Sequence, residues 1–256
     1  MSETLHQSPR STAVAAGRGL AKALVRFVRA RWQLLLLLFL GVGIPLVGFG
    51  ALADDVWQTT GGIGPDDAIL RYVHGHATPG WDAVMEFISL IGYAYGVVPM
   101  VFVVLVALLV ARKRGNALFW AVALGGAGAL NQAAKLTFRR ARPELWLSSA
   151  PEHTYSFPSG HAMGSMALVA ALAVLAWPTR WRWWAIVVGG AFTLLVGFSR
   201  VYLGVHYPSD VVAGWSASLA WVLGLSLVAY GRIGKPRERA TPAAAGPDPV
   251  EPPAQR

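Results

Sequence analysis

Basic and imidazole side chains gather in two short stretches of the sequence. The first runs from "KLTFRRARP" to "PSGH", and the second reads "SRVYLGVHYPSD". Fixed Arg and Lys side chains suit the oxygens of a transferring phosphoryl group, because they stabilise its charge without moving. A helix that begins within "PSGH" would add free backbone N–H groups, which attract anions. These residue types predict phosphoryl transfer, with the following phosphate ligands: Lys135, Arg142, Ser159, Gly160 and Arg200.

Two histidines in these stretches are the candidate catalytic groups. His161 follows the glycine of "PSGH" and would project beside a bound phosphate from the first turn of a helix. His206 precedes Asp210 by four positions, and Pro208 between them can begin a helix. The carboxylate of Asp210 can therefore reach one ring nitrogen of His206. Such a contact fixes the tautomer and leaves the other ring nitrogen as a nucleophile.

The elements that position these residues are predicted to be membrane helices. Of the 256 residues, 55% are hydrophobic and 14% are charged, whereas soluble domains carry about 25% charged residues. Six uncharged stretches each approach the ~20 residues that span a bilayer: Trp32 to Ala53, Phe87 to Ala111, Gly115 to Ala134, Ala162 to Thr179, Trp183 to Ser199 and Val211 to Gly231. We therefore expect an all-α bundle of six transmembrane helices. The first stretch could be a signal sequence, but its length favours a retained helix.

The distribution of charge predicts the orientation of this bundle. Basic residues precede the first span, separate the second from the third and the fourth from the fifth, and follow the sixth. By the positive-inside rule these segments are cytoplasmic, so we expect a multi-pass protein of the cell membrane with both termini in the cytoplasm. The candidate site, on loops 135–161 and 199–210, then lies at the extracytoplasmic face. The net charge of +9 therefore indicates membrane lipids as partners and no nucleic acid.

The three motifs resemble a known family signature. Lys-x6-Arg-Pro, Pro-Ser-Gly-His and Ser-Arg-x5-His-x3-Asp, in that order, are similar to the signature of the type 2 phosphatidic acid phosphatase superfamily, in particular its bacterial membrane lipid phosphatases. The similarity covers about residues 66–230. All of the signature positions are present: Lys135, Arg142, Pro143, Pro158, Ser159, Gly160, His161, Ser199, Arg200, His206 and Asp210.

The resemblance implies a role for each of these residues. His206 would attack phosphorus and form a phosphohistidine, with Asp210 orienting its ring. His161 would protonate the leaving oxygen and later activate water, acting in turn as acid and base. The five phosphate ligands named above would hold the oxygens. No metal and no other cofactor is required by this scheme.

The position of the site at the membrane rim indicates a lipid substrate, because such a site admits a headgroup whose tail stays in hydrocarbon. We expect hydrolysis of a phosphomonoester or pyrophosphate, with these candidates: polyprenyl pyrophosphates such as undecaprenyl pyrophosphate, phosphatidic acid and phosphatidylglycerol phosphate. A lipid phosphotransferase that uses the same intermediate and a non-enzymatic membrane transporter are the alternatives. The sequence leaves these open, together with soluble phosphoesters and the oligomeric state.

Several polar residues near the motifs are interpreted as structural. Arg139 and Arg140 are expected to contact lipid headgroups or the membrane interface. His153 is expected on the surface of the outer loop. His74 and His76 lack further obvious ligands, which argues against a metal site.

The segments around the signature complete the predicted organisation. The stretch "GPDDAILRYVHG" predicts a short interfacial helix that starts near Asp66 and has Ile69, Leu70 and Val73 on one side. Packing of this helix against the bundle is an equally good interpretation. Residues 18–231 are expected to form the six-span phosphatase domain, with the signature region at 135–210. The cytoplasmic ends, 1–17 and 232–256, are expected to be disordered.

Overall fold

The computed structural model describes residues 26, 29, 31–32, 34–59, 61–146, 148 and 150–230, so the predictions for 1–17 and 232–256 lie outside the described residues. Throughout the described part of the chain, every regular element is a helix. The elements are the π-helical segment η1 (Leu38–Gly43) and the α-helices α2 (Ile44–Gln58), α3 (Asp66–His74), α4 (Pro79–Ile91), α5 (Val97–Val110), α6 (Arg114–Phe138), α7 (Gly160–Ala176), α8 (Arg182–Tyr202) and α9 (Pro208–Tyr230). The all-α class is thereby confirmed.

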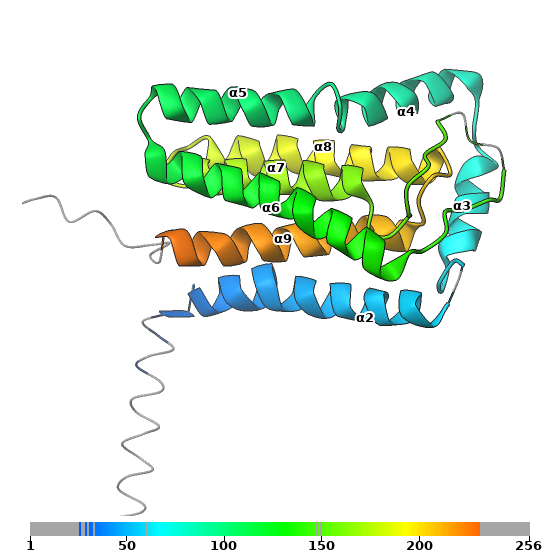
Figure 1. The fold of residues 1–256 in the computed structure, drawn as a ribbon, viewed down its shortest axis with the longest axis horizontal. Coiled ribbons are helices and arrows are strands. Elements are labelled where there is room, and N and C mark those ends of the chain that lie inside the picture. Colours follow the sequence, from blue (N-terminus) through cyan, green and yellow to red (C-terminus); the bar gives the residue numbers. More distant parts are fainter. Residues whose placement is uncertain are drawn as a thin grey trace, which may run out of the picture.

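The long helices form a bundle. Figure 1 shows α2, α5, α6, α7, α8 and α9 lying lengthwise beside one another, with α4 continuing the line of α5 and α3 crossing one end. Helix α7 packs against α5, α6, α8 and α9, and α2 packs mainly against α9. Within the described residues, four helices are long and apolar enough to cross a bilayer: Leu34–Gln58, Arg114–Phe138, Arg182–Tyr202 and Pro208–Tyr230.

The second predicted span is not one helix. Instead of running unbroken through the uncharged stretch, the chain leaves α4 at Ile91, turns, and enters α5 at Val97. Gly96 permits this turn, because a Cβ atom at that position would overlap the backbone carbonyl oxygen of Ile91. The absence of charge therefore marked an apolar segment correctly but did not reveal its break.

Two other helices extend beyond their predicted ends. Helix α6 continues to Phe138 and carries Lys135 in its last turn, and α8 continues to Tyr202 and carries Arg200 there. Both cationic side chains are buried in the bundle. The sequence prediction ended each span at its first charge, but a charge that finds partners inside the protein does not stop a helix.

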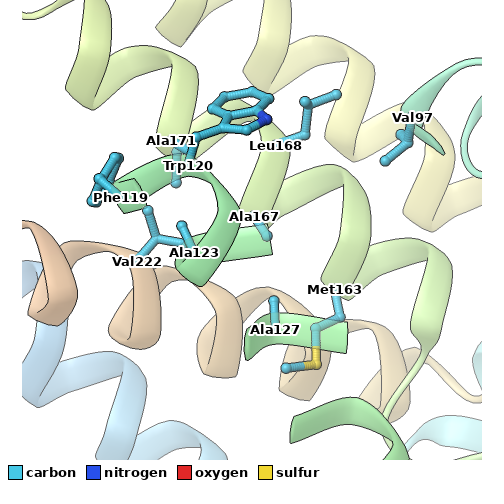
Figure 2. Close-up of a cluster of buried hydrophobic side chains, with 11 residues drawn as sticks. Val97, Phe119, Trp120, Ala123, Ala127, Met163, Ala167, Leu168, Ala171 and Val222 are labelled. Atoms are coloured by element: carbon cyan, nitrogen blue, oxygen red, sulfur yellow. The ribbon is translucent and has the colours of Figure 1, made fainter. Parts of the chain in front are cut away.

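The apolar core lies between α6, α7 and α9. Trp120 on α6 is fully buried, and its ring N–H donates a hydrogen bond of 2.9 Å to the carbonyl oxygen of Val101. Figure 2 shows small residues around it, among them Ala123, Ala167 and Ala171. Small side chains let helices approach closely, which gives packing energy that does not depend on water.

Helix α3 closes the end of the bundle. The helix begins at Asp66, as predicted, and packs against α8 and α9. Leu70 is fully buried and packs with Ala162, Val201 and Val211, whereas Ile69 is exposed. The crossing helix thus forms one wall of the region in which the signature residues meet.

Candidate active site

The signature motifs meet at the end of the bundle that α3 closes. Lys135 and Arg200 project from the last turns of α6 and α8, while His161 and Asp210 project from the first turns of α7 and α9. The second and third motifs are joined directly, because the backbone N–H of Ser159 donates to the carbonyl oxygen of Asp210 at 3.1 Å. The structure therefore brings together the two predicted stretches.

His206 and Asp210 form the contact predicted from their spacing. Nδ1 of His206 lies 3.4 Å from Oδ2 of Asp210, and α9 begins at Pro208 between them. The same Oδ2 accepts hydrogen bonds from the backbone N–H of Tyr207, at 2.9 Å, and from the hydroxyl of Ser156. These donors hold the carboxylate against the ring.

The other nitrogen of His206 faces the basic cluster. Nη1 of Arg142 donates to Nε2 at 3.1 Å. Since a guanidinium has no acceptor, Nε2 carries the lone pair and Nδ1 carries the proton. Burial lowers the pKa of His206 well below its usual 6.5, and the charges of Arg142 and Arg200 lower that pKa further. The ring is therefore a neutral imidazole with its lone pair directed toward the cations.

A carboxylate lies at the centre of the cationic groups. Oε2 of Glu152 accepts a hydrogen bond of 2.6 Å from Nη2 of Arg142, and Oε1 accepts one from Nη2 of Arg200. The same Oε1 lies 3.8 Å from Nδ1 of His161. Burial raises the pKa of Glu152, but the charges of Arg200, Arg142 and Lys135 more than offset this and leave that pKa below its usual value. An anion thus already occupies the point at which these side chains converge.

Lys135 joins the cluster through the loop before α7. Its Nζ donates to the hydroxyl of Thr154 at 3.0 Å and to the carbonyl oxygen of Tyr155 at 2.5 Å. Nη2 of Arg142 donates to the same Thr154 hydroxyl at 3.0 Å. The two cations of the first motif therefore meet at one oxygen atom.

The start of α7 offers hydrogen-bond donors that are not in use. Ser159 is the N-cap residue, yet its hydroxyl makes no capping hydrogen bond. That hydroxyl is buried and has no partner among the described residues. Gly160 opens the helix, where the first backbone N–H groups lack intrahelical acceptors. All predicted ligands thus border one site.

Comparison with known proteins agrees with this geometry. A family model described as the PAP2 superfamily matches residues 115–233, which include all three motifs. Phosphatidylglycerophosphatase B of Bacillus subtilis (strain 168) is 30% identical over 162 residues, covering 60% of this chain and 78% of the relative. The chain belongs to the PAP2 superfamily. The family resemblance inferred from the motifs is confirmed.

Two further PAP2 relatives extend the match over most of the chain. Undecaprenyl-diphosphatase of Sulfolobus acidocaldarius is 30% identical over 202 residues, which cover 77% of this chain and 89% of the relative. The crystal structure of a transmembrane PAP2 type phosphatidylglycerolphosphate phosphatase from Bacillus subtilis aligns with a TM-score of 0.64 at 26% identity. That alignment covers 73% of this chain and 92% of the other. The fold is therefore that of a membrane PAP2 protein.

The expectation for Arg140 is wrong. Its side chain has no exposed surface and pairs with Asp210 and Asp66 instead of with lipid headgroups. Arg139, next to it, is exposed, and so is His153, as predicted. His74 stacks on Trp146 with ring centroids 3.9 Å apart. The two neighbouring arginines of the first PAP2 motif thus have different surroundings.

Sequence reasoning missed three polar residues of the site. Glu152 and Ser156 contact the signature side chains, and Asn131 donates a hydrogen bond of 3.0 Å to the carbonyl oxygen of Pro158. None of them belongs to the PAP2 signature. Asn131 precedes Lys135 by four positions on α6, so helical spacing could have placed both on one face. No local signal distinguishes Glu152 from other loop carboxylates.

An apolar groove adjoins the site. It has a volume of about 230 Å³ and lies between α5, α6 and α7. Asn131 and Gly160 line its end near the signature, and Tyr93, another lining residue, has its ring centroid 5.1 Å from that of His161. Gly125 and Gly128 line the side formed by α6, where a larger side chain would meet open space. The groove therefore runs along the helices from the neighbourhood of His161.

Proposed function

We propose that this PAP2 protein is a membrane lipid phosphatase that hydrolyses a phosphomonoester or pyrophosphate through a phosphohistidine on His206. The observation that carries the proposal is the anion-binding cluster around Glu152. Two guanidinium groups and an imidazole converge on one carboxylate, and Arg142 also contacts the lone pair of His206. A phosphoryl group that replaces this carboxylate would have cations on its oxygens and a nucleophile beside its phosphorus.

The first step transfers the phosphoryl group to the protein. Nε2 of His206 attacks phosphorus, so a P–N bond forms while the P–O bond to the lipid breaks. Arg142, which now donates to Nε2, moves its hydrogen bond to a phosphate oxygen, where Arg200, Lys135 and the α7 N-terminus add further donors. His161, whose protonated form is favoured by the negative charge of the bound phosphate, gives a proton to the leaving oxygen. The lipid product departs as an alcohol, or as a monophosphate if the substrate is a pyrophosphate.

The second step returns the protein to its starting state. His161, now neutral, removes a proton from water, and the water oxygen attacks phosphorus. The P–N bond breaks, inorganic phosphate leaves, and the electron pair returns to Nε2 of His206. Asp210 holds Nδ1–H of His206 through both steps and stabilises the positive ring. Every proton and bond is accounted for by the side chains of the chain and by water.

The distribution of charge supports a site at the extracytoplasmic face of a six-span protein. Arg112 and Lys113 lie between α5 and α6, Arg180 lies between α7 and α8, and Arg114 and Arg182 begin α6 and α8. This is the end of the bundle opposite α3. By the positive-inside rule that end, together with both termini, would be cytoplasmic. In this arrangement α4 with α5, and the shorter α7, would complete six crossings, and α3 would lie at the outer membrane interface.

The apolar groove supports a lipid substrate. It begins beside His161 and follows α5, α6 and α7, so a phosphate held at the cluster could extend a hydrocarbon tail along the groove. Relatives named for phosphatidylglycerophosphate and for undecaprenyl diphosphate both resemble the chain at 30% identity. Phosphatidic acid remains a third candidate.

The proposal is tested with detergent-purified protein and a panel of phosphate esters. Phosphatidylglycerol phosphate, undecaprenyl pyrophosphate and phosphatidic acid are compared with glycerol 3-phosphate by released phosphate, in the presence of EDTA. We expect the lipids to be hydrolysed faster. His206→Ala should lower the rate by about 10⁴-fold or more, because it removes the nucleophile. His153→Ala, on the exposed loop surface, is the matched control.

Three results would contradict the proposal. Undiminished hydrolysis by the His206→Ala variant would exclude the phosphohistidine. Transfer of labelled phosphate to a second lipid without release would identify a phosphotransferase. Faster hydrolysis of glycerol 3-phosphate than of every lipid would exclude lipid specificity.

A further inference from the structure

Arg140 is a buried cation that the proposed mechanism does not use. Its five N–H donors all have acceptors: Nη1 donates to Asp210 and Ser209, Nη2 donates to Asp66 and to the carbonyl oxygen of Gly61, and Nε donates to the same carbonyl. A guanidinium has five donors and no acceptor. Arg140 therefore has none left for a phosphate or a lipid headgroup, and its function lies in what it holds.

Arg140 holds the carboxylate of Asp210, which orients the ring of His206. Nη1 donates to Oδ1 of Asp210 at 2.5 Å, while the other oxygen, Oδ2, faces Nδ1 of His206 at 3.4 Å. The guanidinium also lies over the ring of Tyr207, 4.1 Å from its centroid. One oxygen of the carboxylate is thus fixed by Arg140, and this leaves the other directed at the imidazole.

Asp66 fixes Arg140 in turn. Oδ2 of Asp66 accepts from Nη2 of Arg140 at 2.9 Å, and Oδ1 accepts from the backbone N–H of Ser209 at 3.0 Å. Its Oδ2 also accepts hydrogen bonds from the Ser209 hydroxyl, at 2.5 Å, and from the backbone N–H of Ile63, at 3.0 Å. Asp66 begins α3, whereas Ser209 lies in the first turn of α9, beside Asp210. The crossing helix is therefore joined to the catalytic turn.

We propose that Arg140 and Asp66 are positioning residues for His206, acting through the carboxylate of Asp210. The inference rests on the proposed function. Without the guanidinium, two buried carboxylates would share one region with no cation between them, and a buried charge without its partner is strongly unfavourable. Asp210 would then lose the contact that directs Oδ2 at His206. The phosphate ligands would be untouched, because Arg140 contacts none of them directly in the described structure.

The test begins with Arg140→Gln and its neighbour Arg139→Gln as the matched control. Orientation of the nucleophile matters in the transition state, so we expect Arg140→Gln to lower kcat about 100-fold while KM stays unchanged, as for partners that orient a catalytic group. The inhibition constant of inorganic phosphate should also stay unchanged, because the phosphate cluster is intact. Arg140→Lys retains the charge and should recover part of kcat. Arg139 is exposed, and its replacement should change neither constant.

A double variant separates positioning from simple charge balance. Arg140→Gln combined with Asp66→Asn removes the cation together with one of its two carboxylates. If Arg140 served only to neutralise Asp66, this variant would regain native kcat. We expect it to regain thermal stability and retain the loss of kcat. If Arg140→Gln alone does not fold, kcat is measured on the double variant instead.

The outcomes distinguish this inference from the proposed function. If the wild-type protein releases no phosphate from any substrate of the panel, the proposed function fails. If the wild-type protein is active and a folded variant without a cation at position 140 has native kcat, the positioning role is overturned. A rise in KM or in the phosphate inhibition constant with unchanged kcat would also overturn it, because it would make Arg140 a ligand.

Discussion

The two halves of the bundle are held together in different ways. Around Trp120 the contacts are apolar, and the indole N–H has its acceptor in the carbonyl oxygen of Val101. At the end closed by α3, the buried residues include Lys135, Arg140 and Arg200. There the contacts are ion pairs and hydrogen bonds that join segments far apart in the sequence.

This difference implies that the apolar half determines mainly the stability of the protein, whereas the polar half determines mainly its activity. A cavity in the apolar half loses packing between helices but leaves every charge with its partner. A substitution in the polar half leaves a buried charge unpaired or removes a ligand, and it alters the place proposed for the phosphate. Stability and activity should therefore respond to substitutions in different halves of the molecule.

Arg200→Gln should have the largest effect at the polar end. Arg200 pairs with Glu152 and donates to Ser89, and it faces the position proposed for phosphate. Loss of one fixed donor to a transition-state oxygen should lower kcat/KM about 1000-fold, or about 4 kcal/mol. Steady-state kinetics on the preferred lipid measures the change. Arg182→Gln, at the opposite end, is the control, and a loss below about tenfold in Arg200→Gln would argue against a direct role.

Trp120→Ala should lower the stability of the protein and leave its activity unchanged. Removal of a fully buried indole leaves a cavity between α6 and α7, which should lower the free energy of unfolding by about 3 kcal/mol. At a temperature where the variant is folded, kcat/KM should equal that of the wild type. Unfolding in detergent followed by circular dichroism measures the first quantity. Trp183→Ala, whose indole is exposed on α8, should leave both unchanged; a large loss of kcat/KM in Trp120→Ala would mean that the halves are coupled.

In the apolar half, sequence patterns predicted where the apolar helices lie, but not where those helices break or end. Uncharged stretches located the long helices, because a bilayer excludes charges that lack partners. They did not reveal the break between α4 and α5, which depends on the close approach of Gly96 to the carbonyl of Ile91. They also ended α6 and α8 too early, because Lys135 and Arg200 are buried among partners that come from other helices. Local composition contains no information about such partners.

At the polar end, the motif residues could be predicted from the sequence, but the residues that hold them in position could not. Lys135, Arg142 and His206 have side chains whose chemistry alone suggests phosphate binding and attack. Arg140 and Arg142 are the same residue type two positions apart, and only the fold decides that one meets Asp66 while the other meets Glu152. Asp66 precedes Arg140 by 74 positions. Contacts over such distances follow from the packing of α3, not from local spacing.

Glu152→Gln should have the smallest effect of the three substitutions, and the direction of the change in phosphate binding is informative. Its carboxylate is held by Arg142 and Arg200, so a phosphate must displace it before binding them. A neutral amide binds guanidinium groups less strongly and does not repel an incoming anion. The inhibition constant of inorganic phosphate should therefore fall about tenfold, or about 1.4 kcal/mol.

The matched control for Glu152 is Glu144→Gln, an exposed carboxylate of the same loop, which should leave the phosphate inhibition constant unchanged. Phosphate competition against the preferred lipid, measured at one pH for all variants, gives the constants. If Glu152→Gln instead weakens phosphate binding, the carboxylate serves to hold the two guanidinium groups in position. Glu152 would then stabilise the polar end as Trp120 stabilises the apolar half. In that case one residue at the centre of the site would affect both stability and phosphate binding.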